Sequence, residues 1–116
     1  MSEIVNTIAQ QIRLNRWKDK GYVAVKVDDM TLRLVKRSKN FEKPPLAADI
    51  KYDEAADYYR LAFYNGFNVV KRMDNVGEDI LNGVLVDFFY GNHGARRESM
   101  LEWLNMRMPT VYRRSG

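Results

Sequence analysis

The sequence contains no cysteine and a single histidine, His93. Without cysteine the chain can form neither disulfides nor metal sites with thiolate ligands, and one histidine cannot build a multi-histidine site. No apolar run approaches the roughly 20 residues of a membrane span, and polar residues such as Asn6 and Thr7 interrupt the segment where a signal peptide has its apolar region. We therefore expect a cytoplasmic protein that holds no metal and no other cofactor.

Motifs for catalysis are also missing. Gly91 and Gly94 fit neither a phosphate-binding loop nor a dinucleotide-binding fingerprint, and the chain has no nucleophile elbow. His93 falls in a turn between two expected helices, where a capping or surface role explains it better than general-base catalysis. Acidic residues such as Asp57 and Glu78 fall in the first turns of expected helices, where the helix dipole favours carboxylates. These features predict a protein that is not an enzyme.

What the chain does have is an ordinary globular composition with a basic excess. Its 116 residues are 46% hydrophobic and 29% charged, which predicts one folded domain over residues 1–116. The net charge is +4, and basic segments flank an acidic middle at 53–90. This asymmetry favours a basic patch on one side of the fold, although solvated surface charge explains it equally well.

The spacing of apolar residues predicts an N-terminal helix and a central core helix. Isoleucines four positions apart, from Ile4 to Ile12, form a stripe on a helix over residues 3–17. The strongest pattern lies at 76–90, where apolar residues recur at helical spacing: Val76, Ile80, Leu81, Val84, Leu85, Phe88 and Phe89. This second helix is the most apolar long element, so we expect the others to cover it.

Residues 22–28 and 31–37 alternate between apolar and polar side chains, which predicts a β-hairpin. A two-residue loop between these strands would place Val25 opposite Leu34 and Lys26 opposite Arg33. All the apolar residues of the hairpin would then share one side, where a helix must cover them because an isolated hairpin is only marginally stable.

Most of the remaining chain is expected to be helical. Tyr59 and Phe63 lie on one face of a predicted helix over 53–72. The other expected segments are a basic connector at 36–45, an irregular link at 46–52, a last helix at 95–108, a possible third strand at 110–113 and a basic tail at 113–116. The predicted fold class is α+β: a single small domain with an N-terminal helix, a β-hairpin and then three helices.

Basic side chains gather around the hairpin and near the C-terminus, which favours binding to nucleic acid or to an acidic partner. Arg96 and Arg97 lie in the first turn of the expected last helix, where the dipole disfavours cations, so they need an acidic neighbour such as Asp87 or an external anion. The layout of residues 76–107 resembles a helix–turn–helix, although Asp87 stands where that motif usually has a small residue. The candidate residues are Lys26, Arg33, Lys36, Arg37, Lys39, Lys43, Arg96, Arg97, Arg107, Arg113 and Arg114.

Aromatic side chains are dense between Tyr52 and Phe67. Tyr58 and Tyr64 fall off the main stripe of the predicted helix and are expected to be exposed. Together with Trp103 they are the candidates for a protein-binding surface, because Tyr and Trp are enriched at the centres of interfaces. Packing of these rings against the hairpin is the competing explanation.

Two functional classes remain. The first is a small non-enzymatic regulator or inhibitor that docks on a larger protein, such as a nucleic-acid-processing machine, in the manner of a phage or mobile-element accessory protein. The second is a module that binds DNA or RNA directly through the basic hairpin and the C-terminal arginines. The density of tyrosines and the lack of catalytic motifs favour the first class. The sequence predicts neither the partner's identity nor the oligomeric state.

Overall fold

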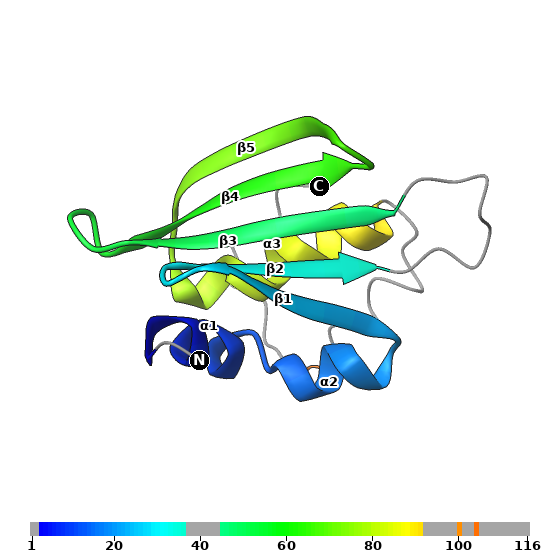
Figure 1. Cartoon of the computed structure of the whole chain (residues 1–116), viewed down its shortest axis with the longest axis horizontal. Helices are drawn as coiled ribbons and strands as arrows, with labels where there is room; N and C mark the ends of the chain where they lie inside the picture. Colours follow the sequence, from blue (N-terminus) through cyan, green and yellow to red (C-terminus); the bar gives the residue numbers. More distant parts are fainter. Residues whose placement is uncertain (1–2, 37–44, 92–99, 101–103, 105–116) are drawn as a thin grey trace.

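The fold is a five-stranded antiparallel sheet that carries its helices on one face (Figure 1). The computed structural model describes residues 3–36, 45–91, 100 and 104. Each strand pairs with its neighbour in the sequence, so the order across the sheet is β1-β2-β3-β4-β5. The elements are α1 (Glu3–Gln11), α2 (Leu14–Asp19), β1 (Tyr22–Asp28), β2 (Thr31–Lys36), β3 (Leu46–Asp53), β4 (Tyr58–Asn65), β5 (Asn68–Val76) and α3 (Glu78–Tyr90). The predicted order of one helix, a hairpin and three helices is therefore wrong.

The helix expected over 76–90 is present as α3, which begins after Gly77. All six residues from Leu81 to Val86 are buried, and the four apolar side chains among them join a single core with side chains of α1, α2 and the inner face of the sheet. Burial on nearly every side explains why α3 is apolar around most of its circumference. The core comprises Val5, Ile8, Ile12, Trp17, Tyr22, Leu32, Leu34, Ala48, Ile50, Tyr59, Leu61, Phe63, Val76, Leu81, Val84, Leu85, Val86, Phe89, Met100 and Leu104.

The largest correction concerns residues 53–72, which were expected to form a helix and instead contain β4 and most of β5. Inward residues of β4 alternate with outward ones: Tyr59, Leu61 and Phe63 are 4%, 2% and 1% exposed. Tyr59 and Phe63 are four residues apart, a spacing that fits a helix and a strand equally. Gly66, with φ 63°, lies in the turn between the strands and requires the left-handed backbone that a helix interior would not use.

Two other segments also differ from expectation. The predicted link at 46–52 is part of β3, which lies at the centre of the sheet. The predicted helix over 3–17 is divided into α1 and α2 at Arg13, whose φ of 58° interrupts the helical backbone. The Arg13 side chain donates to the Leu104 carbonyl at 2.9 Å, so the break contacts a segment far along the chain.

The first hairpin is present, but its register differs by one residue from the prediction. Ala24 lies opposite Leu34, and Val25 lies opposite Arg33. A bulge between Lys26 and Asp28 accommodates the extra residue Val27. Because side chains alternate across a strand, this shift sends Val25 and Val27 to exposed positions at 47% and 44% exposure.

The predicted last helix at 95–108, the third strand at 110–113 and the basic tail at 113–116 lie outside the described residues, apart from Met100 and Leu104. Both of these side chains are buried in the core, and the Leu104 N–H donates to the Met100 carbonyl at 2.9 Å. Within residues 3–36 and 45–91, no helix has the length and apolar character needed to cross a membrane.

Candidate functional site

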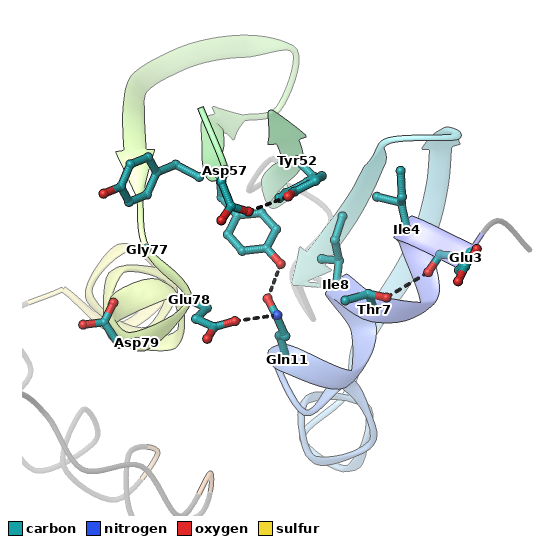
Figure 2. A pocket seen from close by; sticks show the side chains of 12 residues that line it. Glu3, Ile4, Thr7, Ile8, Gln11, Tyr52, Asp57, Gly77, Glu78 and Asp79 are labelled. Carbon is teal, nitrogen blue, oxygen red and sulfur yellow. Dashed lines mark hydrogen bonds between the residues drawn. The ribbon is translucent and has the colours of Figure 1, made fainter. Parts of the chain in front are cut away.

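A pocket of about 500 Å³ opens between α1, the turn that joins β3 to β4, and the start of α3 (Figure 2). Figure 2 shows Glu3 of α1 on one side and Glu78 and Asp79 of α3 on the other, with Asp57 of the turn beside Tyr52. The pocket therefore takes its walls from the first and last helices that the structure describes. Its lining residues are Glu3, Ile4, Thr7, Ile8, Gln11, Tyr52, Asp57, Tyr58, Tyr59, Gly77, Glu78 and Asp79.

The turn between β3 and β4 sets the position of Asp57. The carboxylate of Asp53 accepts the backbone N–H groups of Ala55 and Ala56 at 3.1 and 3.3 Å. The N–H of Asp57 donates to the Asp53 carbonyl at 2.8 Å, and Asp57 itself has a φ of 55°. This geometry directs the Asp57 carboxylate to the hydroxyl of Tyr52, which donates to it at 2.5 Å.

A hydrogen-bonded chain joins the sheet to both helices. The Tyr59 hydroxyl, on β4, donates to the side-chain oxygen of Gln11, on α1. The Gln11 amide nitrogen in turn donates to the Glu78 carboxylate, on α3, at 2.7 Å. Gln11 uses both ends of its amide, so the relative positions of β4, α1 and α3 at the pocket are fixed by polar contacts as well as by the core.

Gly77 allows two pocket side chains to approach the backbone before α3. A Cβ atom at this position would lie 2.6 Å from the Asp79 carboxylate and 3.9 Å from the Tyr58 ring. The Asp79 carboxylate therefore folds back over the N-terminus of α3, where the helix dipole favours a negative charge. The Tyr58 side chain is 46% exposed and forms an open wall of the pocket.

The pocket is negatively charged. Glu3, Asp57, Glu78 and Asp79 contribute carboxylates, and none of the described lining residues is a lysine or an arginine. Burial, followed by the nearby charges of Glu78 and Asp57, raises the pKa of Tyr59 to about 12.

Tyr52 also has a raised pKa. The hydrogen bond to Asp57, followed by burial and by the charges of that carboxylate and of Glu54 and Asp53, raises the pKa of Tyr52 above its usual value. Each phenol thus retains its proton because further negative charge at this site is disfavoured.

This combination of groups suits a cation. Carboxylates form strong charge-assisted hydrogen bonds with ammonium and guanidinium groups, and tyrosine faces attract cations. The rings of Tyr52 and Tyr59 lie 5.6 Å apart, tilted by 57°, and add an aromatic surface beside the acids. Nowhere in the described part of the chain do three or more His, Cys, Asp or Glu side chains come together as a possible metal site.

The described cations of the predicted basic patch lie apart from this pocket and from one another. Lys26 forms an ion pair with Asp29 at 3.0 Å. Arg33 binds Asp49 through two hydrogen bonds of 2.6 and 3.0 Å on the sheet face opposite the helices. Lys36 donates to the Phe89 carbonyl of α3 at 3.4 Å. The other predicted cations lie outside the described residues: Arg37, Lys39, Lys43, Arg96, Arg97, Arg107, Arg113 and Arg114.

The predicted protein-binding tyrosines are also separated. Tyr58 lines the pocket, whereas Tyr64 lies on the sheet face opposite the helices, where the Arg33 guanidinium is 5.3 Å from its ring centre. Trp103 lies outside the described residues. Sequence reasoning missed the pocket acids because each of them fits a helix N-terminus or a turn, and no local pattern indicates that Glu3 and Asp79 line one pocket.

Comparison with known proteins finds no matching family model, and it finds no match among curated protein sequences or solved structures. The function is therefore inferred from the chemistry of the pocket itself.

Proposed function

We propose that the protein is a non-enzymatic binding protein that docks on a larger protein, and that the pocket between α1 and α3 receives a cationic group of that partner. The observation that carries this proposal is the lining of the pocket, which combines four carboxylates and three tyrosines with no basic side chain among its described residues. A lysine or arginine side chain of a partner is the commonest protein group with matching charge.

The net charge of +4 does not oppose this proposal. The described residues carry slightly more acidic than basic side chains, so the basic excess belongs to segments outside them. Exposed charges are screened beyond a Debye length of about 8 Å at physiological ionic strength. A cation that enters the pocket is therefore governed mainly by the carboxylates around it.

The pocket is also organised before a partner arrives. Gln11 holds Glu78, and Tyr52 holds Asp57, through hydrogen bonds that already exist in the free protein. Side chains that are ordered in advance lose less conformational entropy on binding, which favours affinity. A small protein that binds in this way without a chemical step acts by occupying part of its partner's surface, as a regulator or an inhibitor does.

The test is fluorescence anisotropy with a labelled peptide in which lysine and arginine alternate with glycine and serine, compared with a peptide of the same length that carries glutamate instead. We expect the basic peptide to bind and the acidic peptide not to bind. Asp79→Asn should weaken the basic peptide about two- to fivefold, as the loss of one partly exposed ion pair does. Asp19→Asn removes the same charge from the end of α2, outside the pocket lining, and serves as the matched control.

Three results would contradict the proposal. The basic peptide would fail to bind, the acidic peptide would bind equally well, or Asp79→Asn and Asp19→Asn would have the same effect. In the last case, binding would depend on the total charge of the chain and not on the pocket.

A further inference from the structure

The face of the sheet opposite the helices carries a second, independent surface. Arg33, Asp49, Ala62 and Arg72 lie directly opposite one another across β2, β3, β4 and β5, so their side chains share one face. The core residues of the same strands occupy the other face, where α1, α2 and α3 pack.

Cations on this face lie nearer to solvent than most of the acids that accompany them. The Arg33 side chain is 39% exposed, whereas its partner Asp49 is 14% exposed. The Arg60 side chain is 60% exposed over Asp53, which is 18% exposed. Asp74 is the exception, because it is 73% exposed at 4.0 Å from Arg60. Asp49 and Asp53 hold the guanidinium groups of Arg33 and Arg60 in place, and these guanidinium groups are accessible to a ligand.

Two further cations extend this surface. Lys51 lies directly opposite Arg60 on the neighbouring strand, and Arg72 lies opposite Ala62 on β5. Both residues are exposed, and neither forms an ion pair within the described residues. Arg60 already pairs with Asp53, so Lys51 and Arg72 are the cations of this face whose charge remains for an external anion.

Tyr64 completes the arrangement. It lies on the same face as Arg33, and the guanidinium is 5.3 Å from the centre of its ring. Sheet surfaces that combine an aromatic ring with arginines are suited to bases that stack and phosphates that pair, and only single strands expose their bases for stacking.

We propose that this sheet face, formed by Arg33, Lys51, Arg60, Tyr64 and Arg72, binds single-stranded nucleic acid. The exposed guanidinium and ammonium groups match the charge of phosphate. The surface is separate from the acidic pocket, so one molecule holds a cationic protein group and a nucleic-acid strand on different faces.

The experiment measures the affinity of the full chain for a fluorescein-labelled, mixed-sequence single-stranded oligonucleotide across a salt series. The double variant Lys51→Gln/Arg72→Gln should bind several-fold more weakly, and the slope of log K against log salt should fall by about 0.7 for each cation removed. Lys71→Gln is the matched control because Lys71 is next to Arg72 in the sequence but opposite the core residue Phe63, which places its side chain on the other face. The control should bind as the wild type does.

Further binding measurements distinguish this proposal from the alternatives. Asp79→Asn should leave oligonucleotide binding unchanged, because the pocket is a different site. Duplex DNA that binds as tightly as the single strand would overturn the single-strand assignment. A polyglutamate peptide that binds as tightly, and loses affinity equally in the double variant, would show that the face serves an acidic protein instead.

The proposal also fails if the oligonucleotide does not bind, if the double variant binds normally, or if Lys71→Gln causes the same loss. Thermal melting of each variant establishes that it is folded. None of these results would change the interpretation of the basic-peptide test, which concerns the pocket alone.

Discussion

The indole nitrogen of Trp17, on α2, lies 3.3 Å from the side-chain oxygen of Asn82, on α3, and both side chains are buried. The same indole N–H donates to the Ile12 carbonyl at 2.9 Å, where the chain leaves α1. One donor thus satisfies polar groups from two parts of the helical layer. Buried polar groups without a partner cost about 1–3 kcal/mol each, so this contact fixes how α2 sits against α3.

Trp17→Phe should destabilise the protein by about 2–4 kcal/mol, because it removes the shared donor and leaves part of a fully buried volume empty. Urea denaturation followed by circular dichroism measures the change. Tyr58→Phe, which alters an exposed ring, should change the free energy of unfolding by less than about 0.5 kcal/mol. Equal effects of the two substitutions would show that the indole contact is unimportant.

Val84→Asp should prevent folding. Val84 is 5% exposed in the middle of α3, and an unpaired charge there costs several kcal/mol, comparable with the whole stability of a small domain. Val70→Asp places the same charge on β5, where the side chain is 55% exposed, and should leave the melting curve nearly unchanged. A Val84→Asp protein that melts like the wild type would contradict the central position of α3.

Gly66→Ala distinguishes the observed turn from the helix expected on sequence grounds by the sign of its effect. In a helix interior, alanine would stabilise the protein by about 1 kcal/mol relative to glycine. At the observed φ of 63°, alanine should instead destabilise it by about 1–2 kcal/mol, because a Cβ atom is disfavoured in the left-handed region. Denaturant unfolding of the wild type and of Gly66→Ala, compared at equal m-values, measures the change in stability. An increase in stability would refute the β4–β5 turn.

The register of the first hairpin is tested by a pair of alanine substitutions. Leu34 is fully buried, and Leu34→Ala should cost about 2–5 kcal/mol. Val25 is 47% exposed on the other face, and Val25→Ala should cost no more than about 1 kcal/mol. In the register expected from the sequence, both side chains would lie in the core and both losses would be large.

Stability should fall in alkaline solution as Tyr59 ionises. Its pKa is raised from 10.0 to about 12 in the folded protein, so the unfolded chain loses the proton first. The contribution of Tyr59 is therefore complete below pH 10 and is lost as the pH rises towards about 12. Urea unfolding at successive pH values should show a smaller alkaline loss for Tyr59→Phe than for the wild type, and identical slopes would contradict the assignment.

The sequence predicted those elements whose pattern has one interpretation. The apolar run that forms α3 is too long and too regular for a strand, and residues 22–28 and 31–36 alternate clearly enough to indicate β1 and β2. The register between these two strands could not be predicted, because the bulge at Val27 leaves no mark in the pattern of apolar and polar residues.

The helix predicted over residues 53–72 was wrong because tertiary context decides the structure of this segment, which contains β4 and the first part of β5. The spacing of Tyr59 and Phe63 fits the apolar period of a helix and that of a strand. Only the pairing of β4 with the central strand β3 selects the strand. The Asn65-Gly66 pair was the available turn signal.

The candidate site was less predictable still. Tyr58 was identified as a candidate for protein binding, and it does line the pocket. Its acidic neighbours come from α1, the β3–β4 turn and α3, and each has an adequate local explanation. Only the packing of the first helix near the last one brings them together, and that packing is a property of the whole fold.

The separation of Glu3 and Asp79 along the chain has a consequence for synthesis. During translation α1 leaves the ribosome first. The pocket that α1 lines cannot form until all five strands and the start of α3 have also emerged. We therefore expect nascent chains shorter than this to lack the acidic pocket, although Glu3 of α1 has already emerged. The proposed partner would then recognise only molecules whose synthesis has passed the start of α3, and the order of translation would itself delay the first encounter.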